Sequence, residues 1–238
     1  MRRFFCDNIT TDTATITGDD AHHIARVLRM KAGDALSLCD GAGNEYDALI
    51  ASVSPEAVSC TVSNPHASEA ESPIQVTLFQ CLPKTGKMEM IVQKCTELGV
   101  FSVVPVQSAR CVVVPGKDYD KKRERYNRVA LEAAKQSRRA MIPRVLPLTE
   151  LKKIDVQAFD LFLVAYEDEN TVSLKQALRA TSPQTIALLI GPEGGLEEGE
   201  IRQIVQAGAK SVSLGKRILR TETAGMAMLA QVLYEVEE

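Results

Sequence analysis

Residues 188–201, LLIGPEGGLEEGEI, place a glycine-rich turn and several acidic side chains directly after an apolar run. Glycines at the end of a buried strand let a ligand approach the backbone closely at the carboxyl edge of a parallel sheet. The spacing matches neither GxGxxG nor the GxxxxGK phosphate loop, and the glutamates would repel a phosphate. A ligand with positive charge and hydroxyl donors, such as S-adenosylmethionine (SAM), suits the turn better. A tight turn that binds no ligand is the alternative.

A second segment, SLGKRILRTETAGMAML at 213–229, adds cations to an otherwise ordinary helix start. Gly215 ends a strand, and Thr221 is expected to cap the following helix. Such a start needs no cations, so we expect the three in this segment to face a substrate anion. Ile218 and Leu219 are expected to form a flat apolar wall for an adenine ring. The three cations are Lys216, Arg217 and Arg220.

Residues 110–144 carry 11 basic and 4 acidic side chains, which is typical of a surface that meets a polyanion. Within 121–139, an apolar stripe at helical spacing predicts an amphipathic helix, formed by Tyr126, Val129, Ala130, Ala133 and Ala134. The opposite face holds Lys121, Arg125, Arg128, Lys135 and Arg139, with Glu132 among them. A stripe of one sign forms few salt bridges within the helix, which favours phosphate contact. A solvated helix face is the alternative.

The elements around these motifs alternate between strand and helix. Apolar, partly β-branched runs predict strands at 74–80, 101–106, 160–166, 185–191 and 210–215. Helices are predicted at 86–98, 121–139, 171–180, 197–207 and 221–236. This alternation indicates an α/β domain with a mostly parallel sheet over residues 73–238.

The first 70 residues have a different pattern, with short strand-like runs, a hairpin turn at 40–45 and one helix at 21–30. The polar segment 64–73 is interpreted as a linker. Residues 1–72 hold 5 basic and 11 acidic side chains, whereas residues 73–238 hold 23 and 20. We therefore predict a small β-barrel domain at 1–70 that binds a partner and carries no catalytic group of its own.

Composition excludes several classes of protein. The 238 residues are 45% hydrophobic and 25% charged, with no apolar stretch long enough to span a membrane. The start, MRRFFCDNITTD, lacks the apolar region of a signal peptide. The six cysteines are scattered without a metal-binding spacing, so we expect reduced thiols, no metal and a cytoplasmic location.

Taken together, IGPEGG (190–195) and SLGKRILRTETA (213–224) resemble the signature of the SPOUT superfamily of RNA methyltransferases. The resemblance is closest to the 16S rRNA (uracil-N3)-methyltransferase family, and further matches lie at 22–30, 84–100 and 135–145. It implies an α/β fold in which a PUA-like barrel precedes a SPOUT domain with a C-terminal trefoil knot.

The resemblance also implies a cofactor, SAM, which leaves as S-adenosylhomocysteine. The residues that match the family's three cofactor loops are Val164, Ala165, Tyr166, Glu167, Gly191, Glu193, Gly194, Gly195, Leu214, Gly215, Ile218, Leu219, Thr221, Thr223 and Ala224. Enzymes of this superfamily are typically homodimers, and the final helix is a candidate interface.

For uracil N3 to accept a methyl group, the nitrogen must lose its proton, so we expect Arg220 to stabilise the uracil anion. Glu222 and Glu193 are the candidates for a general base, although Glu222 is equally suited to a helix start. The expected partner is 16S rRNA in the small ribosomal subunit. The candidate RNA-binding residues are Arg3, Arg26, Arg29, Lys84, Lys87, Arg110, Arg138 and Arg139.

Two alternatives remain open. One is another SPOUT methyltransferase, acting on a ribose 2′-hydroxyl or on tRNA, and the other is an RNA-binding or ribosome-assembly factor without catalytic activity. The net charge of -3 is low for a general RNA binder. It favours a focused contact on the assembled small subunit.

Overall fold

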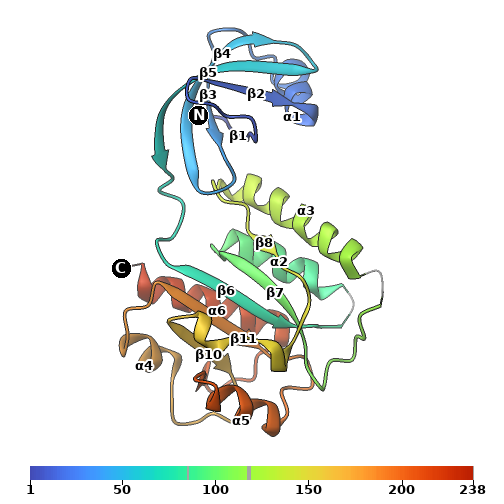
Figure 1. Ribbon diagram of the computed structural model, residues 1–238, viewed down its shortest axis with the longest axis vertical. Coiled ribbons are helices and arrows are strands. Elements are labelled where there is room, and N and C mark those ends of the chain that lie inside the picture. The colour runs from blue at the N-terminus through green and yellow to red at the C-terminus, as the bar shows by residue number, and fades with distance from the viewer. Residues whose placement is uncertain (85, 117–118, 238) are drawn as a thin grey trace. The chain divides into compact units, whose positions relative to one another are not determined.

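A computed structural model of the protein describes residues 1–84, 86–116 and 119–237. The chain separates into two compact units (Figure 1). The first comprises Met1–Glu71 and Ala134–Ile142, and the second comprises Ser72–Ala133 and Pro143–Glu238. Residues 134–142 were not predicted to belong with the first unit. Within the described ranges, no helix has the length and apolar character needed to cross a bilayer.

A curled five-stranded sheet forms most of the first unit. Its strands follow the order β1-β3-β4-β5-β2, with β1 parallel to β3 and the other neighbours antiparallel. The bounds are β1 (Arg3–Phe5), β2 (Thr13–Thr17), β3 (Ala35–Cys39), β4 (Asn44–Val53) and β5 (Ala57–Ala67). Val58, Cys60 and Val62 of β5 alternate with more exposed residues and are buried, as expected for a sheet with one face on a core.

Three local predictions for this unit can be compared with the structure. The hairpin at 40–45 is confirmed, because Asp40 Oδ1 accepts hydrogen bonds from the Ala42 and Asn44 amides at 2.7 and 3.1 Å. The helix begins earlier than predicted: α1 (Gly18–His22) continues as a π-helical turn (His23–Val27). The predicted linker was too long, because residues 64–67 belong to strand β5, and His66 and Ala67 pair with β4.

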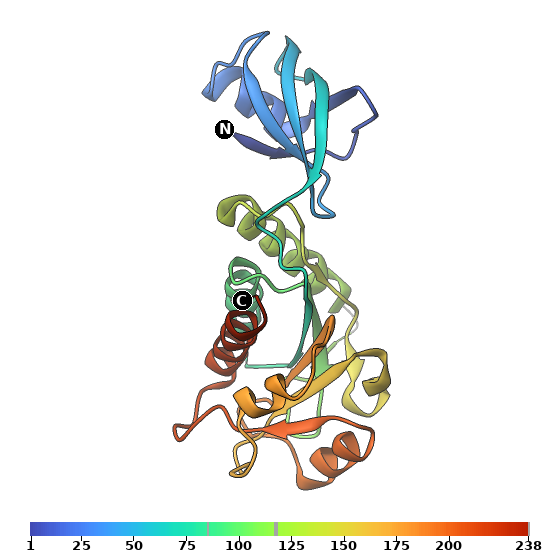
Figure 2. The same cartoon turned by 90° about the vertical axis from the view of Figure 1, so that its left-hand side faces the viewer.

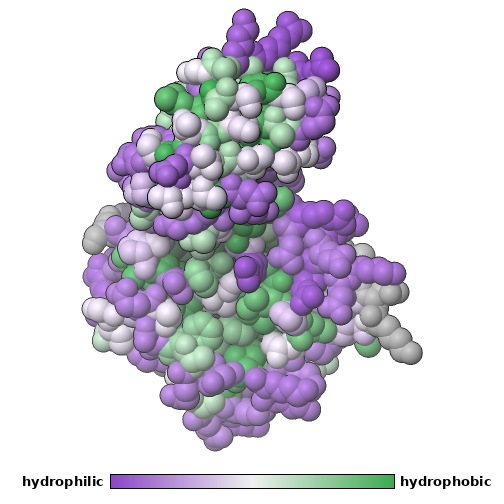
Figure 3. Space-filling view, turned by 45° about the horizontal axis from the view of Figure 1, so that its top comes forward, coloured by the Kyte–Doolittle hydropathy of each residue, from purple (hydrophilic) through white to green (hydrophobic). Residues whose placement is uncertain are grey.

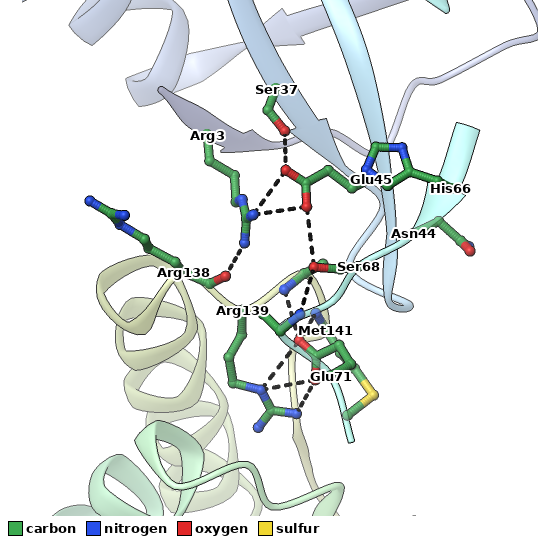
Figure 4. Close-up of polar contacts among 12 residues, drawn as sticks. Arg3, Ser37, Asn44, Glu45, His66, Ser68, Glu71, Arg138, Arg139 and Met141 are labelled. Atoms are coloured by element: carbon green, nitrogen blue, oxygen red, sulfur yellow. Dashed lines mark hydrogen bonds and ion pairs between the residues drawn. The ribbon is translucent and has the colours of Figure 1, made fainter. Parts of the chain in front are cut away.

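A polar cluster joins residues 134–142 to the rest of the first unit (Figure 4). Glu71 accepts hydrogen bonds from Arg139 and from the Ala140 and Met141 amides, at 2.6, 2.8 and 3.0 Å. Arg3 pairs with Glu45 at 2.8 Å and also donates to the Arg138 carbonyl. Glu71 therefore fixes the chain just beyond the end of helix α3 (Tyr119–Ser137).

The second unit is built on a parallel sheet with the order β12-β10-β11-β6-β7-β8, and β9 also pairs with β7. The strands are β6 (Gln75–Cys81), β7 (Ser102–Gln107), β8 (Arg144–Val145), β9 (Thr149–Glu150), β10 (Leu161–Ala165), β11 (Thr185–Ile190) and β12 (Lys210–Val212). All the described pairings in this sheet are parallel. The prediction of an α/β domain with a mostly parallel sheet is confirmed.

Helices cover both faces of this sheet (Figure 2). One face packs against α2 (Lys87–Glu97), α3, α4 (Leu174–Arg179) and α6 (Thr221–Val236). The other packs against α5 (Glu198–Gln206) and two short 3-10 helices (Leu151–Lys153 and Val156–Ala158). Neighbouring residues on β11 show the consequence, because Leu188 and Leu189 enter opposite cores and both are fully buried. This burial explains the continuous apolar run in the sequence.

Candidate active site

A cavity of about 520 Å³ lies where the neighbouring strands β10, β11 and β12 end. Parallel strands bring the loops that follow them to one edge of the sheet, which is the usual place for a ligand site in this architecture. The lining residues are Lys87, Ala165, Tyr166, Glu167, Ile190, Gly191, Pro192, Glu193, Gly195, Ser213, Leu214, Gly215, Arg217, Ile218, Leu219, Arg220, Thr221 and Ala224.

The glycine loop after β11 packs closely against the loop after β10. Gly195 has φ +69°, and a Cβ atom at this position would lie 2.2 Å from Glu167 Oε1. Gly194 lies against Arg110, which donates a hydrogen bond to the Gly194 carbonyl at 3.0 Å. Glycine at 195 thus satisfies both the left-handed backbone and the close approach of the Glu167 carboxylate.

Thr221 connects three elements beneath the cavity. Its hydroxyl donates to the Gly191 carbonyl at 2.7 Å and accepts from Gln80 Nε2 at 2.9 Å. The prediction that Thr221 caps α6 was wrong, because Arg220 is the N-cap residue and Thr221 is the first residue of the helix. The Thr221 side chain is instead used to hold the glycine loop against β6 and α6.

Lys87, at the start of α2, bridges two carboxylates at the edge of the cavity. Its Nζ lies 3.0 Å from Glu193 Oε1 and 3.0 Å from Glu222 Oε2. Glu193 also accepts from the Lys84 amide at 3.1 Å. The bridge therefore links α2, the glycine loop and the first turn of α6.

The pKa values of the three groups in this bridge are shifted so that each group stays charged. Hydrogen bonds to Glu193 and then to Glu222 raise the pKa of Lys87. Partial burial opposes ionisation of Glu193, but hydrogen bonds from Lys87 and the Lys84 amide lower its pKa overall. The pKa of Glu222 is lowered chiefly by its own backbone amide and also by Lys87.

These shifts bear on the two candidates for a general base. A base is most effective when its pKa lies near the working pH, and both carboxylates are shifted away from neutrality. Glu222 is also absent from the cavity lining. The arrangement therefore suits Glu193 and Glu222 to positioning the loops better than to accepting a proton.

Replacing Lys87 with methionine is expected to weaken ligand binding in the cavity roughly tenfold, because two carboxylates would then face each other without a counter-ion. Calorimetric titration with SAM measures the effect. Lys94→Met is the matched control, since Lys94 lies on the same helix and, among the described residues, forms an ion pair only with Glu97. Equal affinities for the two variants would show that the bridge does not position the cavity.

Glu169 anchors the loop that follows β10. Its carboxylate accepts from Ser211, from the Thr171 hydroxyl and from the Thr171 amide, and these bonds lower its pKa to about 2. The loop that Glu169 holds also carries Glu167, which contacts Gly195.

The pKa of Glu169 is lower in the folded protein than its ordinary value of 4.5. The ionised carboxylate therefore stabilises the fold fully above pH 4.5, and this stabilisation is lost as the pH falls toward about 2. Glu169→Gln should therefore have a lower free energy of unfolding than the original chain at pH 7. Near pH 2 the two free energies should be the same. Denaturant titrations at several pH values measure it. Glu198→Gln, on the exposed face of α5, is the control. A pH-independent difference would contradict the assignment.

Most residues predicted to bind the cofactor line this cavity, and three do not. Val164 is buried in the core, Gly194 lies against Arg110, and Thr223 is exposed on α6. The lining also contains Ile190, Pro192 and Ser213, which lie within the signature segments 190–195 and 213–224 but were not singled out as cofactor-binding residues. The two signature segments were therefore the signal that could have identified them.

The predicted RNA-binding residues divide by their surroundings. The prediction that Arg139 binds RNA was wrong. Its side chain is only 4% exposed and pairs with Glu71 at 2.6 Å, which leaves no surface for RNA. Arg3 is engaged by Glu45. Figure 4 shows the Arg138 guanidinium pointing away from both carboxylates. The exposed candidates are Arg26, Arg29, Lys84, Arg110 and Arg138. Arg110 also bonds the glycine loop, and Lys87 is held by the two carboxylates at the cavity edge.

Among the described residues, no group of three or more His, Cys, Asp or Glu side chains is arranged to hold a metal ion.

Comparisons with known proteins place the chain in a family. A family model described as an RNA methyltransferase domain matches residues 70–233, and an RNA methyltransferase PUA domain model matches residues 16–63. The latter match confirms the PUA-like character predicted for the first domain.

Two curated relatives carry the name ribosomal RNA small subunit methyltransferase E. The protein from Bacillus subtilis is 40% identical over 94% of this chain and 91% of the relative. That from Synechocystis is 35% identical over 95% and 74%. The solved structure of the Neisseria gonorrhoeae protein of this name, bound to S-adenosyl methionine, superposes with a TM-score of 0.83 at 30% identity and covers 98% of this chain and 97% of that one. The chain therefore belongs to the RNA methyltransferase family that includes the ribosomal RNA small subunit methyltransferase E proteins.

Proposed function

We propose that this protein transfers a methyl group from SAM to N3 of a uridine in 16S rRNA, with the assembled small ribosomal subunit as substrate. The observation that carries the proposal is the cavity at the ends of β10, β11 and β12, which collects the residues of all three predicted cofactor loops. Its relatives support the reaction class, because a structure of the same family was solved with S-adenosyl methionine.

The residues of the cavity fit SAM. A volume of about 520 Å³ is in the range of sites that hold a molecule of this size. The glycine loop gives access to backbone groups, the apolar side chains of Ile218 and Leu219 suit an adenine ring, and the carboxylate of Glu167 suits a cation. When bound, SAM would supply an electrophilic methyl group on its sulfonium.

The cations of the cavity have different roles in this proposal. Lys87 is held by two carboxylates and positions loops. Arg220 lines the cavity and has no direct ion-pair partner within the part of the chain that the structure describes, although its charge helps to lower the pKa of Glu222. Its charge is therefore available to stabilise the uracil anion from which N3 has lost its proton. A homodimer and a C-terminal knot, which the family resemblance implies, stay predictions.

The test uses SAM labelled in its methyl group and small ribosomal subunits that lack native modification, followed by digestion and nucleoside mapping. Label in 3-methyluridine is the expected result, and protein-free 16S rRNA should accept less label than the assembled subunit. Label in a 2′-O-methylated nucleoside or in tRNA would show that the protein methylates a target other than uracil N3 of 16S rRNA. Absence of both label and calorimetric SAM binding would leave only an RNA-binding factor.

A further inference from the structure

A second concave surface of the second unit, separate from the cavity at the strand ends, has three arginines in its wall. This groove has a volume of about 670 Å³ and shares no residue with the first cavity. It lies between helix α3 and the segment that begins with strand β8, and we refer to it as the α3–β8 groove. Its lining residues are Arg123, Glu124, Asn127, Arg128, Arg144, Val145, Leu146 and Pro147.

Asn127 fixes the two sides of the α3–β8 groove relative to each other. Its Oδ1 accepts from the Val145 amide at 2.9 Å, and its Nδ2 donates to the Val145 carbonyl at 3.2 Å. Nδ2 also donates to the Arg123 carbonyl at 3.0 Å. The side chain thus bonds both polar groups of one peptide residue in β8. Arg144, the neighbour of Val145, is consequently held across the groove from the arginines of α3.

The structure also separates the cations of the basic stretch 110–144 into engaged and available ones. Arg125 pairs with Glu89, Lys135 with Asp20 and Arg139 with Glu71. Arg123 lies 3.4 Å from Asp120 at the helix start. Arg128 and Arg144 are exposed and form no ion pair with any described residue. Both of them line the α3–β8 groove, and hydrophilic side chains gather over α3 in the space-filling view (Figure 3).

We propose that the α3–β8 groove binds the sugar–phosphate backbone of the RNA substrate. Three arginines and one carboxylate, that of Glu124, line the groove, and guanidinium forks match phosphate oxygens well. Val145, Leu146 and Pro147 add an apolar surface that suits ribose or an unstacked base. This inference rests on the proposed function, since membership of an RNA methyltransferase family favours RNA over an acidic protein as the partner.

The experiment compares full-length variants binding to protein-free small-subunit rRNA at several salt concentrations. Arg128→Gln combined with Arg144→Gln is expected to weaken binding roughly tenfold at low salt. It should also reduce the slope of log K against log salt by about 1.4, because two phosphate contacts are lost. Arg128→Lys with Arg144→Lys should retain most of the affinity. The matched control is Lys175→Gln with Arg202→Gln, which removes the same charge from exposed positions on α4 and α5.

Two further readouts separate this role from a structural one. SAM affinity and the unfolding midpoint should be unchanged in the double variant, and its methyl-transfer rate at saturating RNA should equal that of the original chain. An unchanged affinity and salt slope would overturn the proposal. So would weaker binding to assembled subunits with unchanged binding to protein-free rRNA, because the partner would then be an acidic protein. If the original chain transfers no methyl group, the proposed function fails, and the binding assay still tests the groove.

Discussion

Replacing Arg220 with alanine is expected to reduce methyl transfer about 10²–10³-fold while SAM affinity changes only a few-fold. Removing one preorganised group that stabilises a developing anion typically costs 10²–10³ in rate. Arg220 lines the cavity beside the loops from β11 and β12 and forms no direct ion pair with a described carboxylate, although its charge helps to lower the pKa of Glu222. Single-turnover transfer from labelled SAM measures the rate, and calorimetry measures the affinity.

The control for this result is Lys216→Ala, because Lys216 is a cation of the same loop that does not line the cavity. Arg220→Lys should fall between the original chain and Arg220→Ala, since an ammonium keeps the charge but loses the planar fork. A loss of SAM affinity equal to the loss of rate would assign Arg220 to cofactor binding. Full activity of Arg220→Ala would remove it from the mechanism.

The helices and strands of the second unit were largely predictable, because the period of the apolar pattern and the length of each run determine them. The five main strands and five helices were expected within a few residues of their observed bounds. The glycine loop and the cationic loop were each recognisable from local sequence, and parallel strands necessarily bring such loops to one edge. The short strands β8 and β9 were not expected, since two residues carry no periodic signal.

The roles of individual charges were less predictable, because an ion pair depends on residues far apart in the chain. Lys87 was expected to contact RNA, but its partners are 106 and 135 residues away. Arg139 was expected to contact RNA from the basic face of a helix, and it is buried against Glu71 instead. Helical periodicity places a side chain on a face of its own helix and does not show which segment packs there. The available cations Arg128 and Arg144 become evident only after the other pairs are known.

Loss of the Glu71 carboxylate is expected to have the largest effect on stability. Glu71→Ala should lower the free energy of unfolding by about 3–5 kcal/mol, because it leaves a buried guanidinium without its counter-ion. The pair is enclosed, with Arg139 4% and Glu71 13% exposed. The substitution also removes the acceptor for two backbone amides, those of Ala140 and Met141. Denaturant titration followed by circular dichroism measures the change.

Two companion variants show whether the cost comes from the buried charge. Glu69→Ala removes an exposed carboxylate two residues away and should change the stability by less than about 0.5 kcal/mol. Glu71→Leu combined with Arg139→Met removes both charges, so it should be much less destabilising than Glu71→Ala. If Glu71→Ala costs no more than Glu69→Ala, the guanidinium is accessible to water, and Arg139 would again be a candidate for binding RNA. The expected order, in contrast, assigns Arg139 to holding residues 134–142 on the first unit.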